Sequence, residues 1–135
     1  MSYQEYDHMV ILSWNNSTNQ LTEAGLNIAR EAAAIGKPMI LLTHVPVQSL
    51  VDDTLGSSSK EHWQDRMLLW GKDCYYYPDG NTQELLNMIY AEDSLFQEIL
   101  CGHLHYTWDG MVTNRVHEHV FSPAFSHNVG WITIH

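Results

Sequence analysis

Two short histidine blocks are the residues of this sequence best placed to do chemistry. His44 stands in residues 42–46 (LTHVP), and His103 and His105 stand in residues 101–105 (CGHLH). Imidazole is a borderline ligand that suits Zn, Fe, Mn or Ni, so two or three converging rings can hold such an ion. A single histidine after a strand is more often structural, but two such blocks together favour a divalent metal site.

Each block follows an apolar run that is typical of a buried strand. Residues 39–43 and 97–101 lead directly into the two blocks, and residues 8–14 form an earlier strand. Thr22 is expected to cap a helix that runs to about Ala34, which makes a βαβ unit with the strands on either side. Parallel sheets place ligand sites at the carboxyl ends of their strands, where His44 and the second block would stand.

The remaining elements complete a single expected domain of residues 1–135. Apolar spacing predicts helices over residues 58–70 and 82–90, with a surface loop at 47–59. Short strands are expected at 108–114, 117–122 and 129–134. The fold class is therefore α/β: a layered domain with a mixed sheet, a βαβ start and antiparallel C-terminal strands.

Charge and composition exclude several kinds of partner. Six basic and sixteen acidic residues give a formal net charge of -10, which argues against binding to nucleic acid or to an anionic membrane surface. No segment resembles a signal peptide or a transmembrane helix, so a cytoplasmic location is expected. Cys74 and Cys101 are the two cysteines, too few for a disulfide framework, and Cys101 is expected to be a buried thiol.

The two blocks resemble motifs of the calcineurin-like metallophosphoesterases. Residues 42–46 look like the H-x-P block of that family, and residues 101–105 look like its closing G-H-x-H block. Residues 15–17 (NNS) and 36–38 (GKP) are similar to the turn and the G-K-P that precede H-x-P in many members. The resemblance covers most of the chain and implies the C-terminal half of the family's α/β sandwich.

The resemblance also implies a two-metal phosphoesterase site. Members of the family hold two metal ions bridged by an aspartate and hydrolyse phosphate esters with metal-activated water. His44 and His103 would ligate one ion and His105 the other, and Mn, Fe, Zn or Ni would each suit these ligands. The implied partner is a phosphate-containing substrate, whose class the sequence leaves open.

The carboxylate motifs of the family are absent from this sequence. No D-x-H, G-D-x-x-D or G-N-H-[DE] occurs, since Asp7 directly precedes His8 and Asn81 precedes Thr82. These motifs lie upstream in the family, so Met1 is expected to fall about midway through its domain. Neutral imidazoles alone do not offset the repulsion between two divalent ions, so we expect the chain to be incomplete and inactive alone.

Two other interpretations stay open beside the incomplete enzyme. The chain could be a non-catalytic α/β domain that self-associates into a homo-oligomer and keeps a vestigial metal site, because half of a layered domain exposes apolar surface. A one-metal hydrolase built from His44, His103 and His105 is the third and weaker one.

Two further groups are candidates near the C-terminus. His117 and His119 stand at alternate positions of one expected strand, so their side chains would share a face. Two histidines on one face could bind a metal, but a solvent-exposed strand without metal is the favoured interpretation. Asp109 could orient an imidazole, although a turn with Gly110 is favoured.

Overall fold

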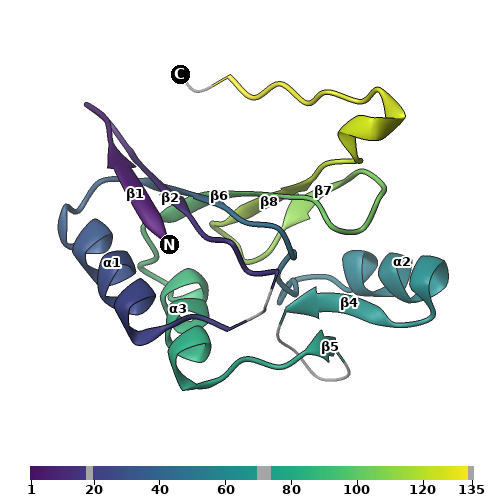
Figure 1. Ribbon diagram of the computed structural model, residues 1–135, viewed down its shortest axis with the longest axis horizontal. Helices are drawn as coiled ribbons and strands as arrows, with labels where there is room; N and C mark the ends of the chain where they lie inside the picture. Colours follow the sequence, from purple (N-terminus) through teal and green to yellow (C-terminus); the bar gives the residue numbers. More distant parts are fainter. Residues whose placement is uncertain (18–19, 70–73, 134–135) are drawn as a thin grey trace.

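The computed structural model describes residues 1–17, 20–69 and 74–133 of the chain, and its main feature is a six-stranded mixed sheet (Figure 1). The strands lie side by side in the order β1-β2-β3-β6-β8-β7. Their bounds are Ser2–Glu5 for β1, Val10–Ser13 for β2, Met39–Leu42 for β3, Phe96–Cys101 for β6, His117–Val120 for β8 and Trp108–Met111 for β7. The other elements are α1 (Glu23–Ala34), α2 (Thr54–Trp63), α3 (Gly80–Tyr90), a small parallel sheet of β4 (Arg66–Leu69) and β5 (Cys74–Tyr76), and a 3₁₀ turn (Ala124–Ser126).

The centre of the main sheet is parallel and its two edges are antiparallel. Strands β2, β3, β6 and β8 run parallel, whereas β1 pairs antiparallel with β2 and β7 pairs antiparallel with β8. This arrangement confirms the expected α/β fold with a mixed sheet, including the βαβ unit of β2, α1 and β3. The antiparallel C-terminal pair is also confirmed, but residues 129–133 form no strand.

Helix α1 begins and ends where its sequence signals predict. The Thr22 side chain accepts a hydrogen bond from the Gly25 amide, which satisfies one of the unpaired N–H groups of the first turn. Leu21 and Leu26 flank this cap and are both buried, as the residues of a hydrophobic staple are. Gly36 follows the helix with φ 76°, a left-handed conformation that glycine adopts without strain.

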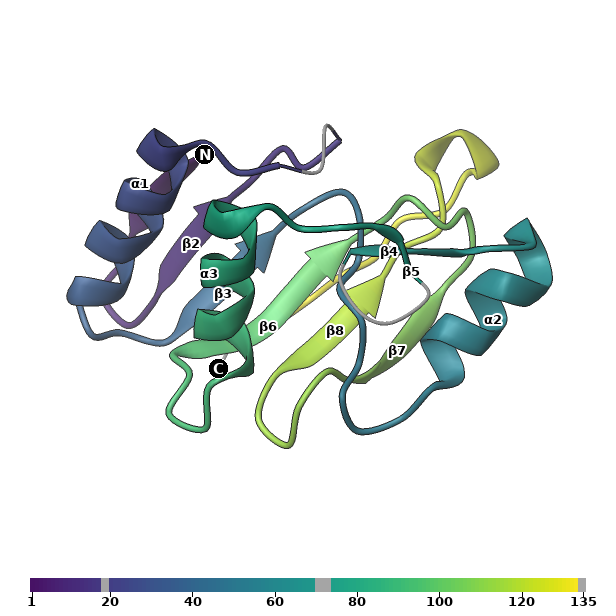
Figure 2. The same ribbon diagram turned by 90° about the horizontal axis from the view of Figure 1, so that it is seen from below.

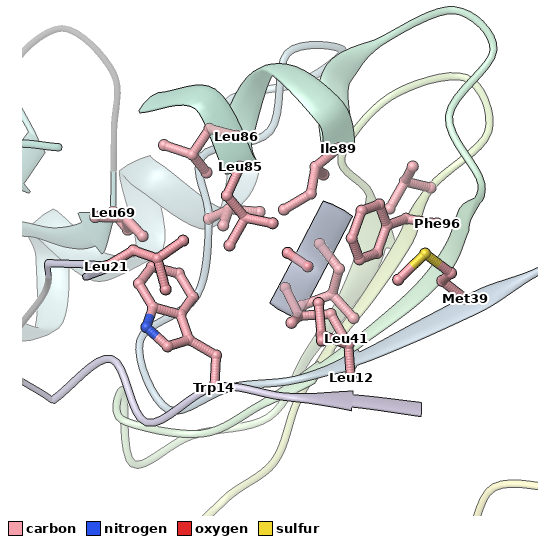
Figure 3. Packing of buried hydrophobic residues seen from close by; sticks show 14 of the residues in the cluster. Leu12, Trp14, Leu21, Met39, Leu41, Leu69, Leu85, Leu86, Ile89 and Phe96 are labelled. Carbon is pink, nitrogen blue, oxygen red and sulfur yellow. The ribbon is translucent and has the colours of Figure 1, made fainter. Parts of the chain in front are cut away.

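Helices α1 and α3 cover one face of the main sheet and enclose the larger core (Figure 2). Figure 3 shows Leu12 and Leu41 of the strands packed beneath Leu85 and Ile89 of α3. Because neighbouring residues of a strand point to opposite faces, Ile40 and Leu42 point away from these helices. A smaller cluster beside it joins α2 and the β4–β5 sheet to β6 and β8 through Leu55, Leu68, Cys74, Cys101, Leu104 and Val120.

The segment between β3 and β5 differs from its sequence prediction. The helix begins at Thr54 rather than near Ser58 and ends at Trp63, and Gln64 follows with a left-handed φ of 61°. The Ser59 hydroxyl then accepts a hydrogen bond from the Met67 amide at 2.8 Å, which turns the chain into strand β4. The expected helical stripe through Trp63 and Met67 is therefore wrong, and its third member, Trp70, lies outside the described residues. The expected surface loop is also wrong in part, since residues 47–49 are buried.

The opposite face of the main sheet carries no α-helix among the described residues. The C-terminal segment, yellow in Figure 1, passes over this face instead. A groove of about 810 Å³ lies there, and its lining includes Ile40, Glu98 and Ile132. None of the described helices is long and apolar enough to cross a membrane.

Candidate metal-binding sites

The two histidine blocks meet at the carboxyl ends of adjacent parallel strands. His44 follows β3 and His103 follows β6, and these strands pair directly. His44 Nε2 lies 3.2 Å from His103 Nδ1, and the ring centroids are 5.0 Å apart in an edge-to-face arrangement. With Zn–N bonds of about 2.0–2.1 Å, two ligand atoms on one tetrahedral ion stand about 3.3 Å apart. The two rings therefore have the spacing of ligands that share an ion.

Asn16 holds the loop that carries His44. Its side chain is fully buried, and Oδ1 accepts hydrogen bonds from the amides of His44 at 2.9 Å and Val45 at 2.8 Å. Its Nδ2 donates to the Val45 carbonyl at 2.9 Å. The Gly102 amide in turn donates to the His44 carbonyl at 3.1 Å, which ties the two histidine loops together.

Backbone strain at this site falls on the histidines themselves. His103 and His105 have φ values of 67° and 62°, in the left-handed region that residues with a Cβ seldom occupy. Such conformations cost about 1–3 kcal/mol each and persist where the surrounding structure enforces them. Gly102 between the two loops does not share this conformation, and an added Cβ there would make an ordinary contact of 3.8 Å with the Phe121 carbonyl.

The His103 ring is half-buried and has a partner on each nitrogen. Nδ1 faces His44, and Nε2 lies 3.2 Å from the Tyr76 hydroxyl. When Nε2–H donates to Tyr76, the lone pair of Nδ1 points toward His44. Burial, then the neighbouring His44 and His105, lower the pKa of His103 to about 4, so this ring is neutral at pH 7.

His105 is not brought into the same cluster. It is exposed, and its ring packs edge-to-face against Trp63 and Phe125 at centroid distances of 5.6 Å and 5.5 Å. Within residues 1–17, 20–69 and 74–133, no cluster of three His, Cys, Asp or Glu ligands contains His44, His103 or His105. A depression of about 480 Å³ borders His44 on the side of Asn15 and Leu42.

A second cluster, formed by Glu98, His117 and His119, could hold a metal ion. These side chains each offer one ligand atom, and the three atoms lie within 4.8 Å of one another. His117 and His119 share a face of β8, as the alternation of the sequence predicts, and Asp109 of β7 contacts both rings. The expected turn at Asp109 and Gly110 is wrong, because both residues lie within β7.

Three residues that contact the site histidines, Glu98, Tyr76 and Asn16, are not identified as site residues by the sequence. Glu98 comes from an apolar strand, and its approach to His117 depends on the pairing of β6 with β8. Tyr76 lies in a segment whose secondary structure the sequence leaves ambiguous. Asn16 belongs to the NNS turn of the sequence, but its bonds to Val45 span 29 residues.

The chain matches no protein-family model, and a comparison with curated proteins likewise finds no match.

Proposed function

We propose that this chain supplies the histidine half of a metal-dependent phosphoesterase site and receives the carboxylate ligands from another polypeptide segment. The observation that carries the proposal is the 3.2 Å approach of His44 Nε2 to His103 Nδ1 at the carboxyl ends of β3 and β6. Sheets of this type present ligands at that edge. His105 lies apart from this pair, with its ring against Trp63 and Phe125, and in the proposed enzyme it would belong to a second ion.

In such a site, some residues of this chain would bind the metal ion and others would position those ligands. His44 and His103 would hold one divalent ion, and Asn16 and Tyr76 would orient them from behind. A bound divalent ion supplies Lewis-acid activation of water and neutralises charge on phosphoryl oxygens. The depression beside His44 gives a substrate room to approach the ring.

Two imidazoles bring no negative charge to a divalent ion. No carboxylate joins His44 and His103 among the residues that the structure describes. Two closely spaced divalent ions repel strongly unless carboxylates lie between them, so the isolated chain is expected to be catalytically silent.

Elemental analysis and metal titration of the purified chain, with His44→Ala and His103→Ala variants, test the proposal. We expect Zn²⁺ or Mn²⁺ bound through both histidines, so each variant should lose that component, whereas His62→Ala, at an exposed histidine elsewhere, should not. A phosphatase assay with added Mn²⁺ should show no robust turnover by the isolated chain. Turnover that survives both histidine substitutions, or the absence of any metal-binding component that depends on both His44 and His103, would overturn the proposal.

Self-association is a second candidate function, favoured by the C-terminal segment. Phe125, Val129 and Trp131 are 75%, 75% and 90% exposed, and their segment passes over the helix-free face of the sheet (Figure 1). Exposed apolar patches of this kind drive association between copies of a chain. Light scattering tests self-association independently of the enzymatic proposal, because it measures the molar mass of the protein in solution. A mass above that of the monomer would support self-association.

A further inference from the structure

Glu98, His117, His119 and Asp109 come together from three adjacent strands on the face opposite α1 and α3. Glu98 of β6 is paired with His117 of β8, and Asp109 of β7 is paired with His119. Ile99 and Glu118, which alternate with these residues, are buried on the other side of the sheet. The four side chains therefore converge above the sheet, away from the histidine blocks at its carboxyl edge.

Glu98 faces one nitrogen of each imidazole. Its Oε2 lies 3.5 Å from His117 Nδ1 and 3.0 Å from His119 Nε2. Both distances are close to the separation of about 3.3 Å expected for two ligand atoms on one tetrahedral ion. One ligand atom from each of Glu98, His117 and His119 therefore lies within 4.8 Å of the other two, close enough for the three to face one ion.

Asp109 holds the opposite nitrogen of each ring. In the tautomers that carry the protons on His117 Nε2 and His119 Nδ1, both rings donate to Asp109, the first to Oδ1 at 2.9 Å and the second to Oδ2. Metal-binding histidines characteristically donate their second N–H to a carboxylate, which fixes the tautomer and the orientation of the ring. Here one carboxylate fixes both rings so that their lone pairs point toward Glu98.

We propose that Glu98, His117 and His119 bind one divalent transition-metal ion, with Asp109 as the positioning residue for both histidines. Two imidazoles and a carboxylate suit Zn²⁺, and disfavour Mg²⁺ and Ca²⁺, which prefer oxygen ligands. The charges of Glu98 and Asp109 together balance a divalent ion. This balance is missing at the His44–His103 pair, so the new site is expected to be the stronger of the two in the isolated chain.

The ion would have two consequences for the molecule. It would link β6 to β8 through their ligands, and β7 to both through Asp109. Because the ion binds the folded state, it would raise the free energy of unfolding by mass action. Three protein ligands also leave a coordination position open. Of the three ligands, Glu98 lines the groove of about 810 Å³ under the C-terminal segment.

Isothermal titration of the metal-stripped chain with Zn²⁺ tests the site. We expect a strong, near-stoichiometric binding component in the wild type that is lost in His119→Gln and in Glu98→Gln, and is weakened about 10- to 100-fold in Asp109→Asn. Zn²⁺ should raise the melting temperature of the wild type by more than that of Glu98→Gln, which keeps only the weaker His44–His103 pair. Co²⁺ in place of Zn²⁺ should give a visible spectrum of nitrogen and oxygen ligands, which His119→Gln removes.

Two controls separate this site from the histidine blocks. The double variant His44→Ala/His103→Ala should keep the strong Zn²⁺ site, and so should His127→Gln at an exposed histidine. Circular dichroism of every variant verifies folding, and Glu98→Gln keeps the shape of the side chain it replaces. Absence of Zn²⁺ binding in the wild type, or strong binding that survives His119→Gln and disappears with His44→Ala/His103→Ala, would overturn the inference. The latter result would leave the proposed function intact.

Discussion

Glu118 is a fully buried carboxyl group whose ionisation the fold suppresses. It lies on β8 and points into the core, where Oε1 accepts a hydrogen bond from the Val47 amide at 2.9 Å. Oε2 has no hydrogen-bond partner of good geometry among the described residues. Burial raises the pKa of Glu118 from 4.5 to about 8, and the Val47 amide and Cys101 thiol offset a part of this effect. At pH 7 the folded chain therefore carries Glu118 mainly as the neutral acid.

The sign of the pH dependence follows from which state binds the proton more tightly. The folded state holds the Glu118 proton up to about pH 8, whereas the unfolded chain releases it near pH 4.5. The contribution of this group to stability is fully present below pH 4.5 and declines as the pH rises toward 8. Each pH unit in that window lowers the free energy of unfolding by about 1.4 kcal/mol. The total loss between pH 4.5 and 8 is on the order of 5 kcal/mol.

The substitution Glu118→Gln should remove this pH-dependent cost. Glutamine copies the neutral acid in shape and keeps the acceptor for Val47, so the variant should match the wild type near pH 4.5. As the pH rises to 8, its free energy of unfolding should exceed that of the wild type by several kcal/mol. Urea denaturation at pH 4.5, 6 and 8, with a chelator present to exclude metal binding, measures this difference.

Two observations decide whether the reasoning on Glu118 holds. The same substitution at the exposed Glu92 removes one negative charge from the surface of a chain of net charge -10 and controls for that change. A difference between Glu118→Gln and the wild type that stays constant from pH 4.5 to 8 would refute the suppressed ionisation. A Glu118→Gln variant less stable than the wild type at pH 8 would show that the carboxylate itself contributes to the fold.

Two further changes test the histidine loop and the C-terminal segment. Asn16→Ala removes three hydrogen bonds to the His44–Val45 loop, two of them buried, and we expect it to cost about 2–4 kcal/mol of unfolding free energy in urea denaturation. The affinity of the His44–His103 pair for metal should also fall in this variant. An unchanged free energy of unfolding would show that the loop keeps its conformation without Asn16. Trp131→Ser should lower the mass of any oligomer seen by light scattering, since Trp131 is 90% exposed; a monomeric wild type would remove the case for self-association.

The sequence by itself determines the local elements that carry the first histidine site. The Thr22 cap, the buried Leu21 and Leu26 and the Gly36 stop define α1 through contacts within a few residues. The apolar runs before His44 and His103 likewise specify strands, because a continuous hydrophobic segment is stable only when both faces are covered. Local order places each ring at the carboxyl end of its strand, but the pairing of β3 with β6 brings the two rings, 59 residues apart in sequence, within 3.2 Å.

The tertiary structure alone decides the second site and the ionisation of Glu118. Glu98 and His119 are 21 residues apart in sequence, and they meet because β8 pairs with β6. The Val47–Glu118 bond spans 71 residues. In the same way, Ser59 directs residues 66–69 into a strand, although their spacing suits a helix. Such features depend on strand pairing and burial, which arise from the packing of distant segments and leave no periodic signal in the local sequence.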